Sequence, residues 1–302
     1  MQSYKKPSAL NIVMGIIFVV LFVITLIYFL PKCQGNALVL VQLASIGEAF
    51  IVLLNLLPKR INKVTFKKEV KKYSLLSVTA ILISVILVVA TVLAGHYVFN
   101  GEKFNFICLL IIAELLIPFF LSFESKKPTV RELVIIAVLC ALAVAGRVAF
   151  NAIPQFKPIG AIVIVSAICL GGEKGFIIGA VSALASNMFF AHGSWTAFQM
   201  LGFGLLGLMA GLIFSKGLLP KNRLAISIFG AVATVVLYGG VANLSSLLYY
   251  PQITLELVYT TYVVYGLPFD LVHAASTALF LWFIPEPALE KLERIKVKYG
   301  IF

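Results

Sequence analysis

Charged residues are scarce in this chain of 302 residues. They make up 12% of it, whereas hydrophobic residues make up 61% and the mean hydropathy is +1.06. A soluble domain of this length must cover its surface with polar side chains, so this composition excludes one. The apolar runs are continuous rather than alternating, which excludes the strands of a membrane barrel. Since only helices and closed barrels satisfy their backbones in lipid, we expect an all-α polytopic membrane protein.

Signatures of catalysis and of bound cofactors are also missing. The sequence has no Gly-rich phosphate loop and no aspartate-rich motif, and its three histidines lie in separate segments. The four cysteines lack metal-ligand spacing. We therefore expect no enzyme activity, no cofactor and no metal. The formal charge of +12 does not predict a nucleic-acid partner, because basic residues flank the cytoplasmic ends of membrane helices.

Ten apolar stretches are candidates for spanning helices, each of which needs roughly 20 residues to cross a bilayer. The sixth and seventh are short and are separated only by residues 172–174, so they are predicted to be thin spans or a re-entrant hairpin. The ten stretches are residues 11–30, 37–57, 74–98, 104–123, 133–150, 158–171, 175–190, 197–214, 224–248 and 259–284.

The basic residues gather on one side of this arrangement. If the N-terminus is cytoplasmic, the cytoplasmic segments hold twenty of the 24 lysines and arginines. Gaining or losing one helix would invert every later loop and spoil this partition. We therefore predict an even number of helices with both termini cytoplasmic, in the plasma membrane of a prokaryotic cell. The basic loop 58–73 is expected to contact anionic membrane lipid or a cytoplasmic partner.

The chain divides into regions of different character. Residues 1–123 form a four-helix region rich in large aliphatic residues, and residues 124–132 form a polar cytoplasmic linker. Residues 133–284 form a six-helix region in which small residues recur at helical spacing, and residues 285–302 form a cytoplasmic basic tail. The role of the first region is not indicated by its sequence.

Small residues make one conspicuous stripe at the start of the six-helix region. Ala137, Ala141 and Ala145 are four residues apart and therefore share a helix face. Such a stripe lets another helix approach closely. It either packs against the rest of the same protein or forms an external docking surface.

Polar residues in and beside the apolar stretches are candidates for function. The outer loops of the six-helix region combine aromatic rings with amides, a composition that suits a pocket for a mid-sized organic molecule. An aromatic belt at the lipid headgroups is the alternative, and it accounts poorly for Arg147, Asn187 and Gln199. Asp270 and His273 are three residues apart on one helix face, where they form either a hydrogen-bonded structural pair or a proton relay.

The stretch from Ala137 to Gly211 resembles the substrate-binding S component of energy-coupling factor (ECF) vitamin transporters. The most specific piece is the run Gly193-Ser-Trp-Thr-Ala-Phe-Gln-Met, followed by Gly204, Gly207 and Gly211. The other pieces are the alanine stripe, Phe156–Pro158, the turn Gly171–Gly175, Gly179-Ala and Ser186-Asn-Met-Phe-Phe. The resemblance covers residues 133–284, and the four helices before it depart from the family's six-helix architecture.

The resemblance implies capture of a vitamin-like substrate, a corrinoid such as cobalamin among the candidates, and delivery by docking on a partner complex. The partners would be a membrane coupling protein and two cytoplasmic ATPases. The stripe Ala137, Ala141 and Ala145 would dock, and the implied substrate-binding residues are Arg147, Asn151, Asn187, Trp195 and Gln199. Two other functions stay open: a self-sufficient proton-coupled transporter that uses Asp270 and His273, and a membrane scaffold without transport activity.

Overall fold

The computed structural model describes six parts of the chain, residues 4–5, 59–60, 75–97, 104–126, 129–250 and 252–299. The predicted spans 11–30 and 37–57, and most of the basic loop 58–73, lie outside the described residues. Two short strands, β1 (Tyr4–Lys5) and β2 (Lys59–Arg60), pair antiparallel.

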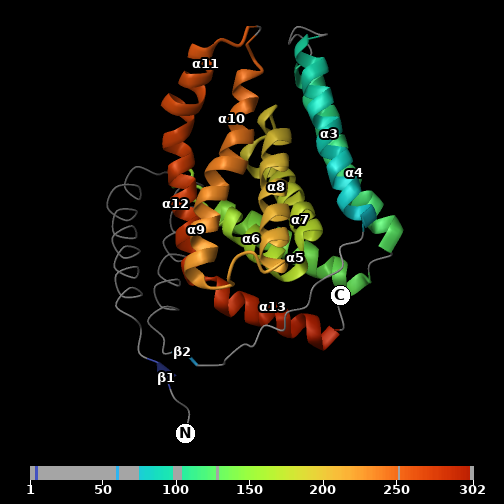
Figure 1. The fold of residues 1–302 in the computed structure, drawn as a ribbon, viewed down its shortest axis with the longest axis vertical. Helices are drawn as coiled ribbons and strands as arrows, with labels where there is room; N and C mark the ends of the chain where they lie inside the picture. Colours follow the sequence, from blue (N-terminus) through green and yellow to red (C-terminus); the bar gives the residue numbers. More distant parts are fainter. Residues whose placement is uncertain are drawn as a thin grey trace.

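Every other described element is helical, and two long helices each contain a π-helical turn, labelled η (Figure 1). The eight predicted spans between residues 74 and 284 all coincide with these helices. The elements are α3 (Leu75–Tyr97), α4 (Phe104–Lys126), α5 (Val130–Ala149), α6 (Ile159–Leu170), α7 (Gly172–Phe190), α8 (Trp195–Ser215), α9 (Arg223–Ala233), η3 (Thr234–Gly239), α10 (Gly240–Leu247), α11 (Leu255–Tyr259), η4 (Thr260–Gly266), α12 (Leu267–Phe283) and α13 (Pro285–Tyr299).

The surface of the bundle has the character of a membrane protein. Within the described residues, four continuous helical segments are long and apolar enough to cross a bilayer: Val130–Ala149, Trp195–Ser215, Arg223–Leu247 and Leu255–Phe283. One face of the third segment carries a row of large apolar side chains four residues apart, each more than half exposed: Leu224, Ile228, Val232 and Val236. Exposure of such an apolar row to water is unfavourable, whereas its contact with lipid hydrocarbon is not. The chain is an all-α polytopic membrane protein.

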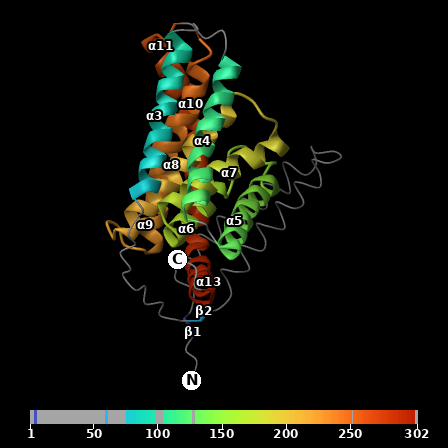
Figure 2. The ribbon, with the colours of Figure 1, turned by 90° about the vertical axis from the view of Figure 1, so that its right-hand side faces the viewer.

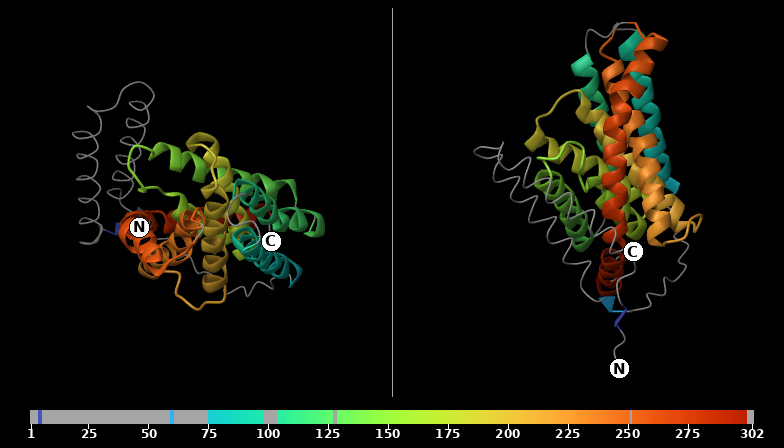
Figure 3. Two further views of the ribbon diagram at one scale, coloured as in Figure 1. Left: turned by 90° about the horizontal axis from the view of Figure 1, so that it is seen from above. Right: turned by 90° about the vertical axis from the view of Figure 1, so that its left-hand side faces the viewer.

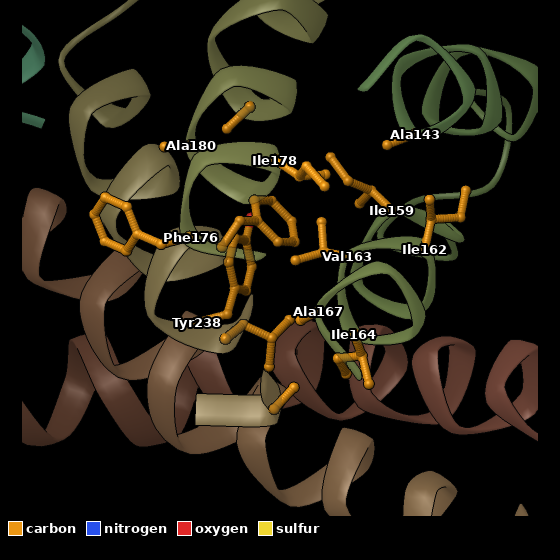
Figure 4. Close-up of a cluster of buried hydrophobic side chains, with 14 of the residues drawn as sticks. Ala143, Ile159, Ile162, Val163, Ile164, Ala167, Phe176, Ile178, Ala180 and Tyr238 are labelled. Carbon is orange, nitrogen blue, oxygen red and sulfur yellow. The ribbon is translucent and has the colours of Figure 1, made fainter. Parts of the chain in front are cut away.

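Helix α6 is the centre of the core. Its 12 residues are all buried. A helix of this length is about 18 Å long, too short for a hydrocarbon layer of about 30 Å. The other helices enclose α6, so it packs against protein along its whole length and does not face lipid. Figure 4 shows its side chains, Ile159, Val163 and Ile164 among them, together with Phe176 and Ile178 of α7.

Helices α7 and α8 approach each other backbone to backbone, through glycines. A Cβ atom added at Gly207 would lie 2.2 Å from the carbonyl oxygen of Gly175, and one added at Gly179 would lie 2.2 Å from that of Phe203. The glycine stripes of these two helices are therefore used for packing inside the protein. This close contact joins the first half of α7 to the middle and later turns of α8.

We expect Gly207→Ala to lower the apparent unfolding temperature in detergent by about 5 to 10 °C, because the methyl group collides with backbone that has no rotamer to relieve it. Gly240→Ala is the matched control, since no atom lies within 4 Å of the added Cβ. It should leave the unfolding temperature unchanged or raise it. Equal unfolding temperatures for the two variants, measured by differential scanning fluorimetry, would contradict the α7–α8 packing.

The remaining helices flank this core. Helices α3 and α4 lie together on the side of α8 opposite to α11 and α12, as the views in Figures 1 and 3 agree. Phe104 of α4 packs edge-on against Tyr249, with ring centroids 4.6 Å apart. Helix α13 lies across the end of the bundle that is far from α11 (Figure 1). Arg223 at the start of α9 forms an ion pair with Glu286 of α13 and so fixes that helix.

Candidate functional site

A hydrogen-bonded network joins the end of α5 to the end of α7. Arg147, in the last turn of α5, donates from Nη1 to Ser186 Oγ at 2.5 Å and to Asn187 Oδ1 at 2.9 Å. Ser186 and Asn187 are fully buried, with 0% of their surface exposed. The guanidinium therefore sits over polar groups inside the protein and does not extend to the membrane surface, as a simple lipid-facing arginine would.

The same asparagine connects α7 to α8. Asn187 Nδ2 donates to Thr196 Oγ1 at 3.0 Å and to Gln199 Oε1 at 2.9 Å, so its amide has no free hydrogen. Thr196 and Gln199 are three residues apart and face the same side in the first turns of α8. Thr196 Oγ1 also accepts from the backbone N–H of Gly193, at 3.2 Å, which anchors the loop between the two helices.

Lys157 lies beside this network, and it was not among the substrate-binding residues predicted from the sequence. It follows the turn that leaves α5, and its Nζ donates to the carbonyl oxygens of Phe150 and Asn151, both at 3.3 Å. Both cations contact the ring of Phe190: Arg147 Cζ lies 4.6 Å and Lys157 Nζ 5.2 Å from the ring centroid. Burial first, and the charge of Arg147 second, lower the pKa of Lys157 to about 8.

Two of the predicted binding residues lie at the rim of the network. The Asn151 side chain is exposed, and its Oδ1 accepts from Lys157 Nζ at 3.5 Å. Trp195 is 43% exposed, and its ring packs on Gly193, where an added Cβ would lie 2.4 Å from ring atoms. The neighbouring Ser194 hydroxyl forms a hydrogen bond with Tyr249. Asn151 and Trp195 therefore lie at the edge of the network, and neither forms a hydrogen bond with Asn187.

Asp270 and His273 of α12 are not bonded to each other. Asp270 Oδ2 accepts from Asn243 Nδ2 at 2.7 Å. His273 is 2% exposed and packs against the rings of Tyr238 and Phe203, at centroid distances of 4.7 and 5.8 Å. Neither ring nitrogen of His273 has a hydrogen-bond partner among the described residues. The interpretation of the two as a hydrogen-bonded structural pair is therefore wrong.

The π-helical turns bring residues to this site that the sequence did not single out. Tyr238 lies in η3, is buried, and has Gln199 within hydrogen-bonding reach of its hydroxyl. Tyr262, in η4, donates to the carbonyl oxygen of Gly240 at 2.7 Å. π-turns are rare and are frequently found at functional sites. No local pattern in the sequence marks them, so only the structure identifies Tyr238 as a neighbour of the network.

The sequence profile of a family described as "ECF transporter, substrate-specific component" matches residues 131–284. The chain belongs to this family. The matched region contains the whole network from Arg147 to His273 and the alanine stripe of α5. The ECF substrate-specific component is a membrane subunit of a transporter, which agrees with the resemblance found in the sequence.

A relative of this ECF component is a UPF0397 protein of the bacterium Vibrio atlanticus (strain LGP32). The two are 29% identical over 132 residues, which cover 39% of this chain and 72% of the relative. No solved structure matches the chain.

The alanine stripe of the ECF component lies on an exposed helix face. Ala137, Ala141 and Ala145 are all exposed, whereas Leu139, Cys140 and Ala143 are buried on the opposite face of α5. The stripe therefore does not serve the internal packing that the glycines of α7 and α8 serve.

The start of α5 is fixed in the fold. Glu132 forms an ion pair with Lys174 of α7, and its backbone N–H donates to the N-cap Thr129 hydroxyl at 3.3 Å. The start of α5 is thus held by these contacts, and the small residues of its exposed face point away from the bundle. Figure 2 shows α5 at the flank of the bundle.

Proposed function

We propose that this chain is the substrate-capture subunit of an ECF-type, ATP-driven importer. It binds a vitamin or a similar micronutrient at one membrane face and delivers it by docking on a partner complex. The observation that carries the proposal is the hydrogen-bonded network of half-buried Arg147, buried Asn187 and half-buried Gln199, which lies inside the region that matches the family. Three helix ends converge there, and their polar groups are the kind that orient a bound organic molecule.

The substrate would lie against this network. His273 and Tyr238 would form its inner wall, and Trp195 and Asn151 its rim. Buried polar side chains in a membrane domain are costly, and a ligand that uses them explains why they are retained. A corrinoid such as cobalamin is one candidate among vitamins of diverse chemistry.

Delivery would use the exposed stripe of Ala137, Ala141 and Ala145. A face of small residues allows the backbone of a partner helix to approach closely, and association between helices in lipid depends on such packing. The partners would be a membrane coupling protein and two cytoplasmic ATPases, which supply the ATP hydrolysis for which this sequence has no phosphate loop.

Charge supports the orientation of the chain. Segments that would face the cytoplasm hold most of its basic residues, and α13, at that end of the bundle, carries Lys291, Arg294, Lys296 and Lys298. In this orientation the network would lie toward the outside of a plasma membrane, where a nutrient arrives. The segment 58–73 is proposed to contact anionic lipid on the cytoplasmic side.

Transport by reconstituted protein tests this function. Proteoliposomes that contain the chain alone should bind substrate without accumulating it, whether or not a proton gradient is imposed. Addition of the coupling protein, the two ATPases and ATP should produce accumulation. If the chain alone accumulates substrate along a proton gradient, and Asp270→Asn abolishes this, the protein is a secondary transporter and the proposal is wrong.

A further inference from the structure

The candidate site contains two neighbouring positive charges that form no ion pair with a carboxylate among the described residues. Arg147 donates to the neutral side chains Ser186 and Asn187, and Lys157 donates to backbone carbonyls and to the amide of Asn151. In the parts of the chain that the structure describes, neither cation forms an ion pair with a carboxylate. Partly buried cations are normally paired, because removing a charge from water is costly.

The two cations are arranged around one aromatic ring. Phe190 lies 4.6 Å from Arg147 Cζ and 5.2 Å from Lys157 Nζ, measured to the ring centroid. Because both groups contact this one ring, their like charges lie near each other and repel. An anion placed between them would relieve that repulsion.

A third group of the same cluster also lacks a partner. His273 is 2% exposed, and both of its ring nitrogens are without a hydrogen bond among the described residues. Arg147 and Lys157 are close enough for their charges to act on its ring. Buried polar atoms are bonded in more than about nine cases of ten, so the unused nitrogens indicate a group that a ligand supplies.

We propose that the substrate is an organic anion whose carboxylate or phosphate oxygens bind Arg147 and Lys157, and whose body presents a polar group to His273. This inference rests on the proposed substrate-capture function and specifies the chemical class that the site accepts. Neutral and cationic analogues lack the group that compensates the two charges, so the site should reject them. Charge-assisted hydrogen bonds of this kind are the stronger ones in proteins.

The test compares matched pairs of probes that differ in the anionic group alone. Nicotinate with nicotinamide and pantothenate with pantothenol test a carboxylate, and pyridoxal 5′-phosphate with pyridoxal tests a phosphate. Thermal unfolding and isothermal titration calorimetry of the full-length chain in detergent give the affinities. At least one anion should bind more tightly than its neutral partner. Arg147→Gln and Lys157→Gln should each lower the affinity for that anion by about 10- to 100-fold.

A matched control removes a positive charge elsewhere. Lys216 is exposed beyond the other end of α8, and Lys216→Gln should leave the affinity unchanged. The inference is overturned if no anion binds better than its neutral partner, or if the preference survives in the double variant Arg147→Gln, Lys157→Gln. If a neutral probe binds more tightly than its anionic partner and Asn187→Leu abolishes its binding, the capture function stands and the inference of an anionic substrate is wrong. Binding of none of these anions by any form of the protein would overturn the inference, whereas the capture function is decided separately by the compounds that co-purify with the chain.

The affinity for the anion should also depend on pH. The pKa of Lys157 is lowered to about 8, and Arg147 from α5 and His273 from α12 are the other titratable groups that act in this cluster. The protonated lysine binds the anion, so affinity is full below about pH 7 and falls as the pH rises through 8. Lys157→Arg keeps its charge above pH 9 and should flatten this profile. If the affinity of Lys157→Arg for the anion declines with pH as that of wild type does, a group other than Lys157 causes the pH dependence.

Discussion

Replacing Ala141 with tryptophan should reduce association with the coupling protein by at least tenfold and abolish ATP-driven uptake, while substrate binding stays unchanged. Ala141 is the middle residue of the exposed stripe of α5, so an indole there would hold any partner helix several ångströms away. Its side chain points away from the buried face that carries Leu139, Cys140 and Ala143, so the fold should tolerate the change.

Ala275→Trp is the matched control for this prediction. Ala275 is also an exposed alanine of a membrane helix, α12, and it lies outside the stripe. Co-purification with the coupling protein and ATPases, followed by uptake assays in proteoliposomes, compares the two variants. Normal assembly of Ala141→Trp would rule out the stripe as the docking face, and loss of assembly in both variants would show a nonspecific effect.

Replacing Asn187 with leucine should abolish substrate binding, with a loss of affinity of about 100-fold or more. The substitution keeps the branched shape of the side chain but removes the acceptor that Arg147 uses and the donor that bonds Thr196 and Gln199. Each buried group left without a partner costs roughly 1–3 kcal/mol, and the arginine would keep only its bond to Ser186. Calorimetric titration of the purified chain measures the effect.

Two further variants separate binding from folding. Gln252→Leu removes an exposed amide outside the network and should alter affinity less than about threefold. Gln199→Leu removes an acceptor of Asn187 and the amide beside the Tyr238 hydroxyl but leaves the bonds of Arg147, so it should weaken binding by about tenfold. If Asn187→Leu elutes as a monodisperse protein and binds as tightly as wild type, the network does not contact the substrate.

The sequence predicted the site to the extent that polarity stands out against apolar runs. Arg147, Asn187 and Gln199 stood out because an aromatic belt at the headgroups accounts poorly for them, and the structure joins them by hydrogen bonds. Asn151 and Trp195 were implied by the resemblance to the S components, and they lie at the rim. Amides and aromatic rings are equally common at the headgroup level, so composition alone does not distinguish a rim residue from a buried one.

Other residues of the site depend on tertiary structure that no local pattern encodes. Lys157 resembles any loop lysine until the turn after α5 places it beside Phe190. Tyr238 belongs to an apolar stretch with several possible helix faces, and the π-turn η3 changes the face on which it lies. Asp270 and His273 share a helix face by spacing, yet their partners come from other helices, so the spacing predicted a bond that does not form.

The fold followed more directly from the sequence. Long apolar runs and the distribution of lysine and arginine predicted the described helices between residues 74 and 284, because lipid allows few other structures. Helix α6 was the exception. Its 12 apolar residues could face lipid or protein, and the distinction depends on the glycines of α7 and α8, whose close approach encloses it.

The most direct test of substrate capture is mass spectrometry of the small molecules that co-purify with the chain in detergent. Wild-type protein should retain one nutrient-like compound in near-stoichiometric amount, and Asn187→Leu, purified in parallel and equally monodisperse, should retain none. The same set of compounds in both preparations, or no compound bound to wild type even after incubation with a broad vitamin panel, would contradict capture at this site.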